Sequence, residues 1–209
     1  MGEGAIWICS TANFFIASLT LRAANLAGSM THEHNLERIL MHKTLDSAQF
    51  RKVMARFVTG VTIVTSRAGE EVHGMTCNAF CSISIAPLTV MVCLTKNSRT
   101  ERLIGKGRVF AVNVLSESQT DLSDRFAGRH KERDENRFDG FPWTTAVTGA
   151  PIFKGSQAYV DCKLMKTFDG GSHIIHLGEV VAAHTDNLKR PLIFYQSGYM
   201  GLDSLRPLK

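Results

Sequence analysis

The feature that most constrains the fold is a series of short strand-like segments separated by turn residues. Residues 61–65 are β-branched throughout and run into turn residues at 68–70, so a return strand is expected from about Val72. Further strands are predicted at 79–85, 88–94, 110–115, 158–165, 173–178 and 180–184. Strands and helices do not alternate regularly, which argues against a doubly wound parallel sheet. The pattern favours a mainly β protein whose antiparallel sheet closes into a barrel.

A few helices are expected beside these strands. Asp46 and Ser47 both offer cap oxygens for a first helix, because the apolar residues after them recur on one helical face. That face consists of Phe50, Val53, Met54 and Phe57. Residues 98–101 have the Ser-x-x-Glu spacing of a capping box, and residues 116–119 repeat it with Gln. Each box predicts a helix that starts there, and the second helix should end at Gly128.

The length of 209 residues suits one domain, and 44% apolar with 21% charged residues is a globular composition. Residues 1–44 are interpreted as an N-terminal extension, either poorly ordered or not native, ahead of a domain at 45–209. Residues 6–27 are apolar but interrupted by polar residues such as Asn13 and Arg22, so no membrane span and no membrane partner is expected.

The net charge of +5 favours anionic partners, among them nucleotide phosphates. Basic residues are mixed with acids, as in residues 129–135, so nucleic-acid binding is not expected, and residues 129–136 are the best candidate for a loop or lid. The five cysteines form no Cys-x-x-Cys pair, which fits reduced thiols in a cytoplasmic protein.

Several common catalytic motifs are absent from the sequence. It has no Gly-x-Gly-x-x-Gly, no phosphate-binding loop ending in Gly-Lys-Ser, and no Gly-x-Ser-x-Gly nucleophile elbow. His173 and His176 should point to opposite faces of a strand, which prevents chelation, so no metal site is expected. One of these histidines should be solvated and the other packed.

The segment 74–80 is the most informative for binding. It brings a glycine, two hydrogen-bonding side chains and an aromatic ring to the start of a strand. A flavin ring needs amides and polar side chains along its pyrimidine edge and apolar walls at its other end, and this segment can supply both. An ordinary turn into a strand explains the same residues equally well.

Seven collinear motifs between about Phe50 and Tyr199 carry a resemblance to a known family. They are Thr-Gly-Val-Thr-Ile-Val-Thr (59–65), Gly-Met-Thr-Cys-Asn-Ala-Phe (74–80), Cys-Leu (93–94) before Ser-Arg-Thr (98–100), Phe-Ala-Val-Asn-Val-Leu (110–115), Leu-Ser-Asp-Arg-Phe-Ala-Gly (122–128), Asp-Gly-Gly-Ser-His (169–173) and Pro-Leu-Ile-Phe-Tyr (191–195). The chain resembles the flavin reductase domain of two-component flavin-dependent monooxygenases. That group includes the reductases that serve 4-hydroxyphenylacetate, phenol and steroid-ring hydroxylases.

The resemblance implies a split β-barrel of Greek-key, FMN-binding type, usually a homodimer with flavin near the dimer interface. It implies an NAD(P)H-dependent flavin reductase, which passes hydride from NADH or NADPH to FMN or FAD and supplies reduced flavin to an oxygenase partner. Two alternatives stay open: a flavin-binding electron carrier or sensor, and an enzyme of the pyridoxamine-phosphate-oxidase type on a similar barrel.

The resemblance also implies site residues. Thr76, Asn78, Ala79 and Phe80 would contact the isoalloxazine ring, and Lys96, Ser98 and Thr100 would hold the flavin phosphate. The phosphate assignment agrees with the capped helix start at Ser98, since a helix N-terminus attracts anions. Phe126, Ala127, Gly128 and Arg129 would lie beside the flavin tail or the nicotinamide. The other implied cofactor-binding residues are Thr59, Thr62, Met75, Cys77, Ser82, Leu94 and Asn97.

His173 matches the family histidine near the nicotinamide and is the implied catalytic residue. The family usually has Asp immediately before it, whereas this chain has Ser172. The missing carboxylate leaves the protonation of His173 open, because a neighbouring negative charge would raise its pKa.

Overall fold

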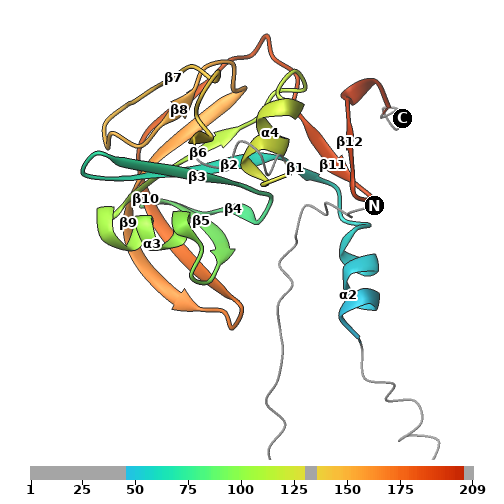
Figure 1. Ribbon diagram of the computed structural model, residues 1–209, viewed down its shortest axis with the longest axis horizontal. Coiled ribbons are helices and arrows are strands. Elements are labelled where there is room, and N and C mark those ends of the chain that lie inside the picture. Colours follow the sequence, from blue (N-terminus) through green and yellow to red (C-terminus); the bar gives the residue numbers. More distant parts are fainter. Residues whose placement is uncertain (1–45, 130–135, 205–209) are drawn as a thin grey trace, which may run out of the picture.

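The computed structural model describes residues 46–129 and 136–204, and a seven-stranded antiparallel sheet dominates it (Figure 1). The strand order is β3-β2-β6-β9-β10-β5-β4. The bounds are β2 (Thr62–Ala68), β3 (Glu71–Cys77), β4 (Phe80–Ile85), β5 (Leu88–Thr95), β6 (Val109–Val114), β9 (Ala158–Asp169) and β10 (His173–Thr185). The predicted extension at 1–44, and residues 130–135 of the predicted lid, lie outside the described residues.

The order of the strands requires the sheet to curl. β3 and β4 are its two edges, yet only Asn78 and Ala79 separate them in the chain. The amide of Cys93 donates to the carbonyl of Ala79 at 3.0 Å, which fixes this crossover against β5. No ladder joins β3 to β4 among the described strands, so the barrel is split along this line. The predicted mainly β split barrel is confirmed.

The interior of the barrel is apolar and closely packed. Its buried cluster includes Val64, Val92, Leu94, Ile104, Phe110, Val112, Cys162 and Leu164. Gly178 on β10 faces this cluster, where a Cβ atom would lie 2.4 Å from the Phe110 ring. Only a glycine allows the strand to pass so close to that ring.

Helix α3 (Arg99–Gly107) confirms the first predicted capping box in part. The Ser98 hydroxyl accepts from the amide of Glu101 at 3.3 Å, as the motif requires. The Glu101 carboxylate reaches one residue further back than expected and accepts from the amide of Asn97 at 3.1 Å. The helix therefore starts where the sequence predicted.

Helix α4 (Thr120–Phe126) starts later than its box predicted. The Gln119 side chain accepts from the amide of Ser116 at 3.1 Å, but Gln119 itself occupies the N-cap position without a side-chain capping bond. The Ser116 hydroxyl donates to the carbonyl of Gly155 at 2.9 Å. The predicted end at Gly128 agrees with its positive φ of 73°.

The prediction of separate strands at 173–178 and 180–184 is wrong. Both belong to β10, which pairs with β9 across register shifts at 177/178 and 180/182. Bulges absorb the extra residues without ending the strand. Short strands form two small sheets: β1 (Thr59–Gly60) with β11 (Ile193–Tyr195) and β12 (Gly198–Met200), and β7 (Trp143–Thr144) with β8 (Ile152–Phe153). A 3-10 turn, η2 (Leu202–Ser204), follows.

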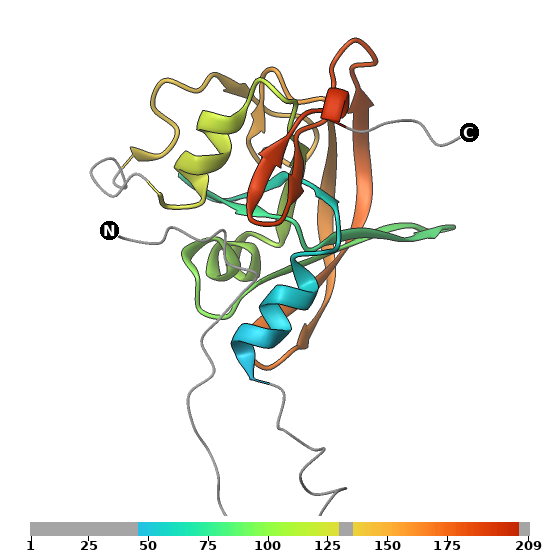
Figure 2. The same ribbon diagram turned by 90° about the vertical axis from the view of Figure 1, so that its right-hand side faces the viewer.

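Two apolar surfaces are exposed, with no element of residues 46–129 or 136–204 covering them. Helix α2 (Ser47–Met54) is capped by Asp46 as predicted, but it ends before Phe57, and none of its residues is buried. The β4–β5 hairpin projects from the barrel and exposes Ile85 and Leu88 (Figure 2). No helix in the described part of the chain is long and apolar enough to cross a membrane.

Candidate functional site

Several predicted site residues lie together at one rim of the barrel, where β3, α3, α4 and β10 come together. The Ser98 hydroxyl lies 3.6 Å from the Met75 sulfur, which links α3 to β3. The Thr76 hydroxyl donates to the carbonyl of Ser123 at 2.6 Å, which links β3 to α4. At the start of β10, the carbonyl of Ser172 accepts from the amide of Lys96 at 3.1 Å.

The crossover between the two edge strands is the open part of this rim. Ala79 is exposed, and the Asn78 amide donates to the Thr59 hydroxyl at 3.4 Å. Just before it, the Thr62 hydroxyl donates to the carbonyl of Cys77. Burial raises the pKa of the Cys77 thiol to about 12, so this cysteine is a packed thiol and not a nucleophile.

The predicted residues therefore divide by exposure. The side chains of Thr62, Cys77, Leu94, Thr100 and Phe126 are buried and support the wall of the site. Ala79, Ser82, Lys96 and Asn97 are exposed, and Thr59, Met75, Thr76, Asn78, Phe80, Ser98, Ala127, Gly128, Arg129 and His173 are half-buried. Direct side-chain contacts to a ligand can come only from the second and third groups.

The start of α3 is suited to bind an anion. Amides in the first turn of a helix have no acceptor within the helix, and the dipole there is positive. The Lys96 ammonium lies beside this turn and pairs with the Asp169 carboxylate at 2.5 Å. The Thr100 hydroxyl is buried and lies 2.8 Å from His73 Nδ1, so only the backbone of Thr100 can serve a phosphate.

The end of α4 is held by a cluster that the sequence analysis did not assign. Arg129 pairs with the Asp124 carboxylate at 2.7 Å and lies over the Tyr199 ring, 5.6 Å from its centroid. The Tyr199 hydroxyl donates to Asp124 at 2.6 Å and lies 2.8 Å from the Ser123 hydroxyl. Burial and the Asp124 carboxylate raise the pKa of Tyr199 to about 12, so the phenol stays protonated. The cluster orients Arg129 at the rim.

His173 lies at the rim with a neutral partner. Its Nδ1 is 2.9 Å from the Ser172 hydroxyl, and His173 pairs with Thr95 across the sheet. Partial burial lowers the pKa of His173 below its ordinary 6.5, so the imidazole is neutral at neutral pH. A neutral ring can position a ligand by a hydrogen bond or by packing, but it adds no charge to the site.

His176 does not join His173 in a site. It is fully buried in the barrel, as expected for one of the two histidines. Among the described residues, no group of three His, Cys, Asp or Glu side chains could hold a metal ion.

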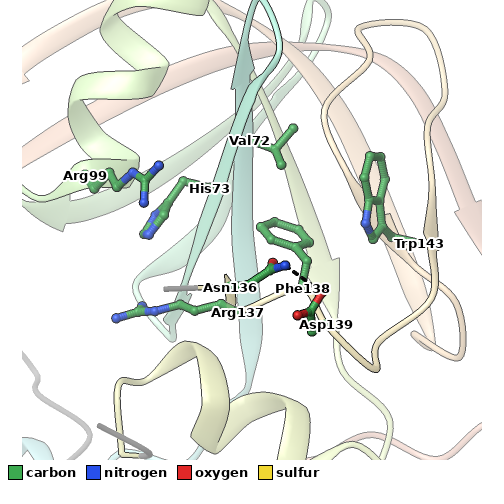
Figure 3. Close-up of a pocket in the computed structure, with 8 residues that line it drawn as sticks. All are labelled: Val72, His73, Arg99, Asn136, Arg137, Phe138, Asp139 and Trp143. Carbon is green, nitrogen blue, oxygen red and sulfur yellow. Dashed lines mark hydrogen bonds between the residues drawn. The ribbon is translucent and has the colours of Figure 1, made fainter. Parts of the chain in front are cut away.

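A cavity of about 320 Å³ opens beside the rim (Figure 3). It is lined by Val72 and His73 of β3, by Arg99 at the start of α3, and by residues between 136 and 143. No sequence pattern predicts this cavity, because its walls come from three separate segments of the chain.

A split antiparallel barrel with a helix start suited to an anion and a neutral histidine at its rim is compatible with binding of a nucleotide cofactor. A family model described as "Flavin reductase like domain" matches residues 54–203. This chain belongs to that family.

Individual relatives agree with this assignment. The flavin-dependent monooxygenase reductase subunit HsaB of Rhodococcus jostii is 37% identical over 161 residues, which cover 77% of this chain and 80% of that protein. An NADH-dependent FAD reductase of Streptomyces globisporus is 36% identical over 139 residues, or 66% of this chain and 76% of that protein. The solved structure of nitrilotriacetate monooxygenase component B from Mycobacterium thermoresistibile matches with a TM-score of 0.72 and 34% identity, over 80% of this chain and 93% of that one.

Proposed function

We propose that this protein is an NAD(P)H:flavin oxidoreductase, the reductase component of a two-component monooxygenase. A hydride passes from C4 of the nicotinamide to N5 of FMN or FAD, so the dinucleotide is oxidised and the flavin is reduced. The observation that carries the proposal is the meeting of the 78–79 crossover, the start of α3 and His173 at one rim. The protein itself supplies geometry and fixed dipoles.

The relatives support the donor, the cofactor and the partner. The Rhodococcus jostii relative is the reductase subunit of a flavin-dependent monooxygenase, and the Streptomyces globisporus relative is an NADH-dependent FAD reductase. A further relative, from Ancylobacter novellus, is an NADH-dependent FMN reductase. An oxygenase that receives the reduced flavin is therefore the proposed partner.

The roles of the rim residues follow from what each can offer. Asn78 and Ala79 present backbone and amide groups to the polar edge of the flavin ring. Ser98 and the first-turn amides of α3 face the flavin phosphate, and Lys96 exchanges its pairing with Asp169 for the phosphate. His173 packs beside the nicotinamide, and the other predicted cofactor-binding residues support these contacts.

Steady oxidation of NADH or NADPH by catalytic amounts of protein, with FMN or FAD added, tests the activity. Sustained turnover of free flavin is expected. A protein that binds flavin but consumes neither dinucleotide would instead be an electron carrier or sensor, and oxidation of pyridoxamine phosphate would indicate the third alternative.

Ser98→Ala tests the phosphate site. The variant should bind FMN about tenfold more weakly, since a hydrogen bond to a charged group is lost, while riboflavin, which has no phosphate, binds as before. Ser98 also caps α3, but structural damage would weaken both ligands equally. Ser118→Ala, an exposed serine away from the rim, is the matched control. Equal loss of FMN and riboflavin binding argues against the assigned role.

The proposal includes a homodimer in the cytoplasm and a reductase domain at 45–209. The exposed apolar side chains of α2 and of the β4–β5 hairpin, such as Val53 and Ile85, support the dimer, because exposed apolar patches mark interaction surfaces. The free cysteines Cys77, Cys81, Cys93 and Cys162 support a reducing compartment. The family match at 54–203 supports the domain bounds.

A further inference from the structure

The cavity beside the rim is continuous with the proposed phosphate site. Arg99 lines it and directly follows Ser98, and His73 in its wall is 2.8 Å from the Thr100 hydroxyl. On the other side, the Arg137 guanidinium donates to the carbonyl of Phe126 at 3.3 Å. The cavity therefore lies between residues 98–100, which are expected at the flavin phosphate, and residues 126–129, which are expected beside the flavin tail or the nicotinamide.

Basic and aromatic groups occupy different sides of this cavity. Figure 3 shows Arg99, His73 and Arg137 toward one side and Phe138 and Trp143 toward the other. The rings of Phe138 and Trp143 meet edge to face with centroids 5.9 Å apart, and Phe138 stacks on Phe153 with centroids 5.5 Å apart. This packing fixes the aromatic wall while Trp143 stays only half-buried.

Two carboxylates also belong to this region, and each has a partner. Asp139 accepts from the Asn136 amide at 2.6 Å, and Glu71 pairs with the Arg99 guanidinium at 3.0 Å. The lining therefore holds the guanidinium groups of Arg99 and Arg137 and one carboxylate, that of Asp139. The charged side of the cavity remains suited to an anion.

We propose that this cavity binds the adenylate half of a dinucleotide, with its phosphate toward Arg99 and its base against Trp143. The proposal rests on the proposed function, because FMN ends at its phosphate and cannot reach beyond Ser98. The cavity volume of about 320 Å³ lies within the range of small-molecule sites and exceeds what one phosphate fills. FAD and NADH both carry an adenylate, and the position beside the flavin phosphate segments favours FAD. The protein accordingly binds FAD more tightly than FMN.

Binding of FAD, FMN and AMP to the full chain tests this proposal by flavin fluorescence and calorimetry. Trp143→Ala should weaken FAD binding about tenfold, the size of a lost base–aromatic stack, and leave FMN binding unchanged. AMP should compete with FAD and not with FMN. Trp143→Phe, which keeps an aromatic ring, should restore most of the FAD affinity. Phe141→Ala is the matched control, since Phe141 packs in the same cluster but does not line the cavity.

Arg99→Gln provides a second variant that is expected to fold, because the Arg99 side chain is exposed at the surface. It should weaken FAD more than FMN. Trp143→Ala could instead raise the KM for NADH, with AMP competing against NADH. In that case the cavity binds the adenylate of NADH and not that of FAD. Unchanged FAD, NADH and AMP affinity in both variants would overturn the proposal. If the wild type bound neither flavin, the proposed function would fail. Direct binding of AMP, and its loss in Trp143→Ala, would still show whether the cavity binds an adenylate.

Discussion

His173 and His176 lie three positions apart on the same strand and have opposite environments. His173 stands at the rim, where a hydroxyl is its neighbour and partial burial lowers its pKa. His176 lies in the barrel, fully buried, where burial and the nearby Arg108 lower its pKa to about 4. Neither ring nitrogen of His176 has a hydrogen-bond partner among the described residues.

The contrast shows that the face of the strand on which a histidine lies determines its environment and its possible role. Side chains an odd number of positions apart in a strand point to opposite faces, so one imidazole reaches the ligand side and the other the core. The rim histidine can contact a nicotinamide and exchange protons with solvent. The interior histidine must stay neutral, because a charge there would have no partner and would face Arg108.

The largest effect is expected in stability as the pH falls. The pKa of His176 is about 4 in the folded protein and near 6.5 when unfolded, so between these values the unfolded chain binds more protons. Stability should therefore be full above pH 6.5 and fall as the pH drops toward 4, by an amount on the order of 3 kcal/mol. Urea unfolding across this window measures it.

His176→Leu removes the titrating group and should flatten that dependence. The lowered pKa of His173 also makes the protein less stable as the pH falls. Because His173 is less buried than His176, it contributes less to the pH dependence of the unfolding free energy. Asp169 and Asp203, whose pKa values are lowered by ion pairs, lose their stabilising charge only below their ordinary value of 3.8. Equal slopes for the variant and the wild type would show that His176 is not the buried titrating group.

An intermediate effect is expected two residues along the same strand. Gly178→Ala would place a methyl group 2.4 Å from the Phe110 ring and 2.9 Å from Cys162 Cβ, which should cost about 1–3 kcal/mol of unfolding free energy. Gly60→Ala is the control, because no atom lies within 4 Å of the added methyl group and Gly60 has no positive φ. An equally small loss of unfolding free energy in both variants would mean that the barrel interior has room for a methyl group at position 178.

The smallest effect concerns the rim. Ser172→Asp places a carboxylate beside His173, which should raise the pKa of His173 and move the pH profile of kcat/KM upward by about one unit. Ser172→Asn, of similar size but neutral, should leave the profile in place. A profile that moves equally in both variants would reflect altered packing and not charge. Unfolding free energy should change little in either.

The sequence predicted those parts of the fold whose signals are local. The hairpin of β2 and β3 was found because β-branched residues flank a turn at Gly69, and α3 was found because Ser98 caps it. The strands β1, β11 and β12 were missed, since each has only two or three residues and pairs with a segment far along the chain. Such pairing follows from the tertiary fold and leaves no periodic pattern.

The sequence predicted which segments form the candidate site, but not which of their side chains are exposed to it. The motifs at 74–80 and 98–100 do meet at the rim, yet nothing in them shows that Thr100 is turned inward to His73. The cluster that holds Arg129 was also not predicted, because Tyr199 lies 75 residues after Asp124 in the chain. Exposure is set by packing and cannot be deduced from spacing alone.

One comparison of two variants tests the account most directly. His173→Gln and His176→Leu are assayed for NADH oxidation with saturating FMN at neutral pH, together with their flavin affinity and thermal midpoint. The account predicts that His173→Gln loses roughly tenfold to hundredfold in kcat/KM through misplaced reactants while its thermal midpoint and flavin affinity hold. His176→Leu should keep its activity. Full activity in His173→Gln, or a loss confined to His176→Leu, would contradict the division between a catalytic rim and a structural interior.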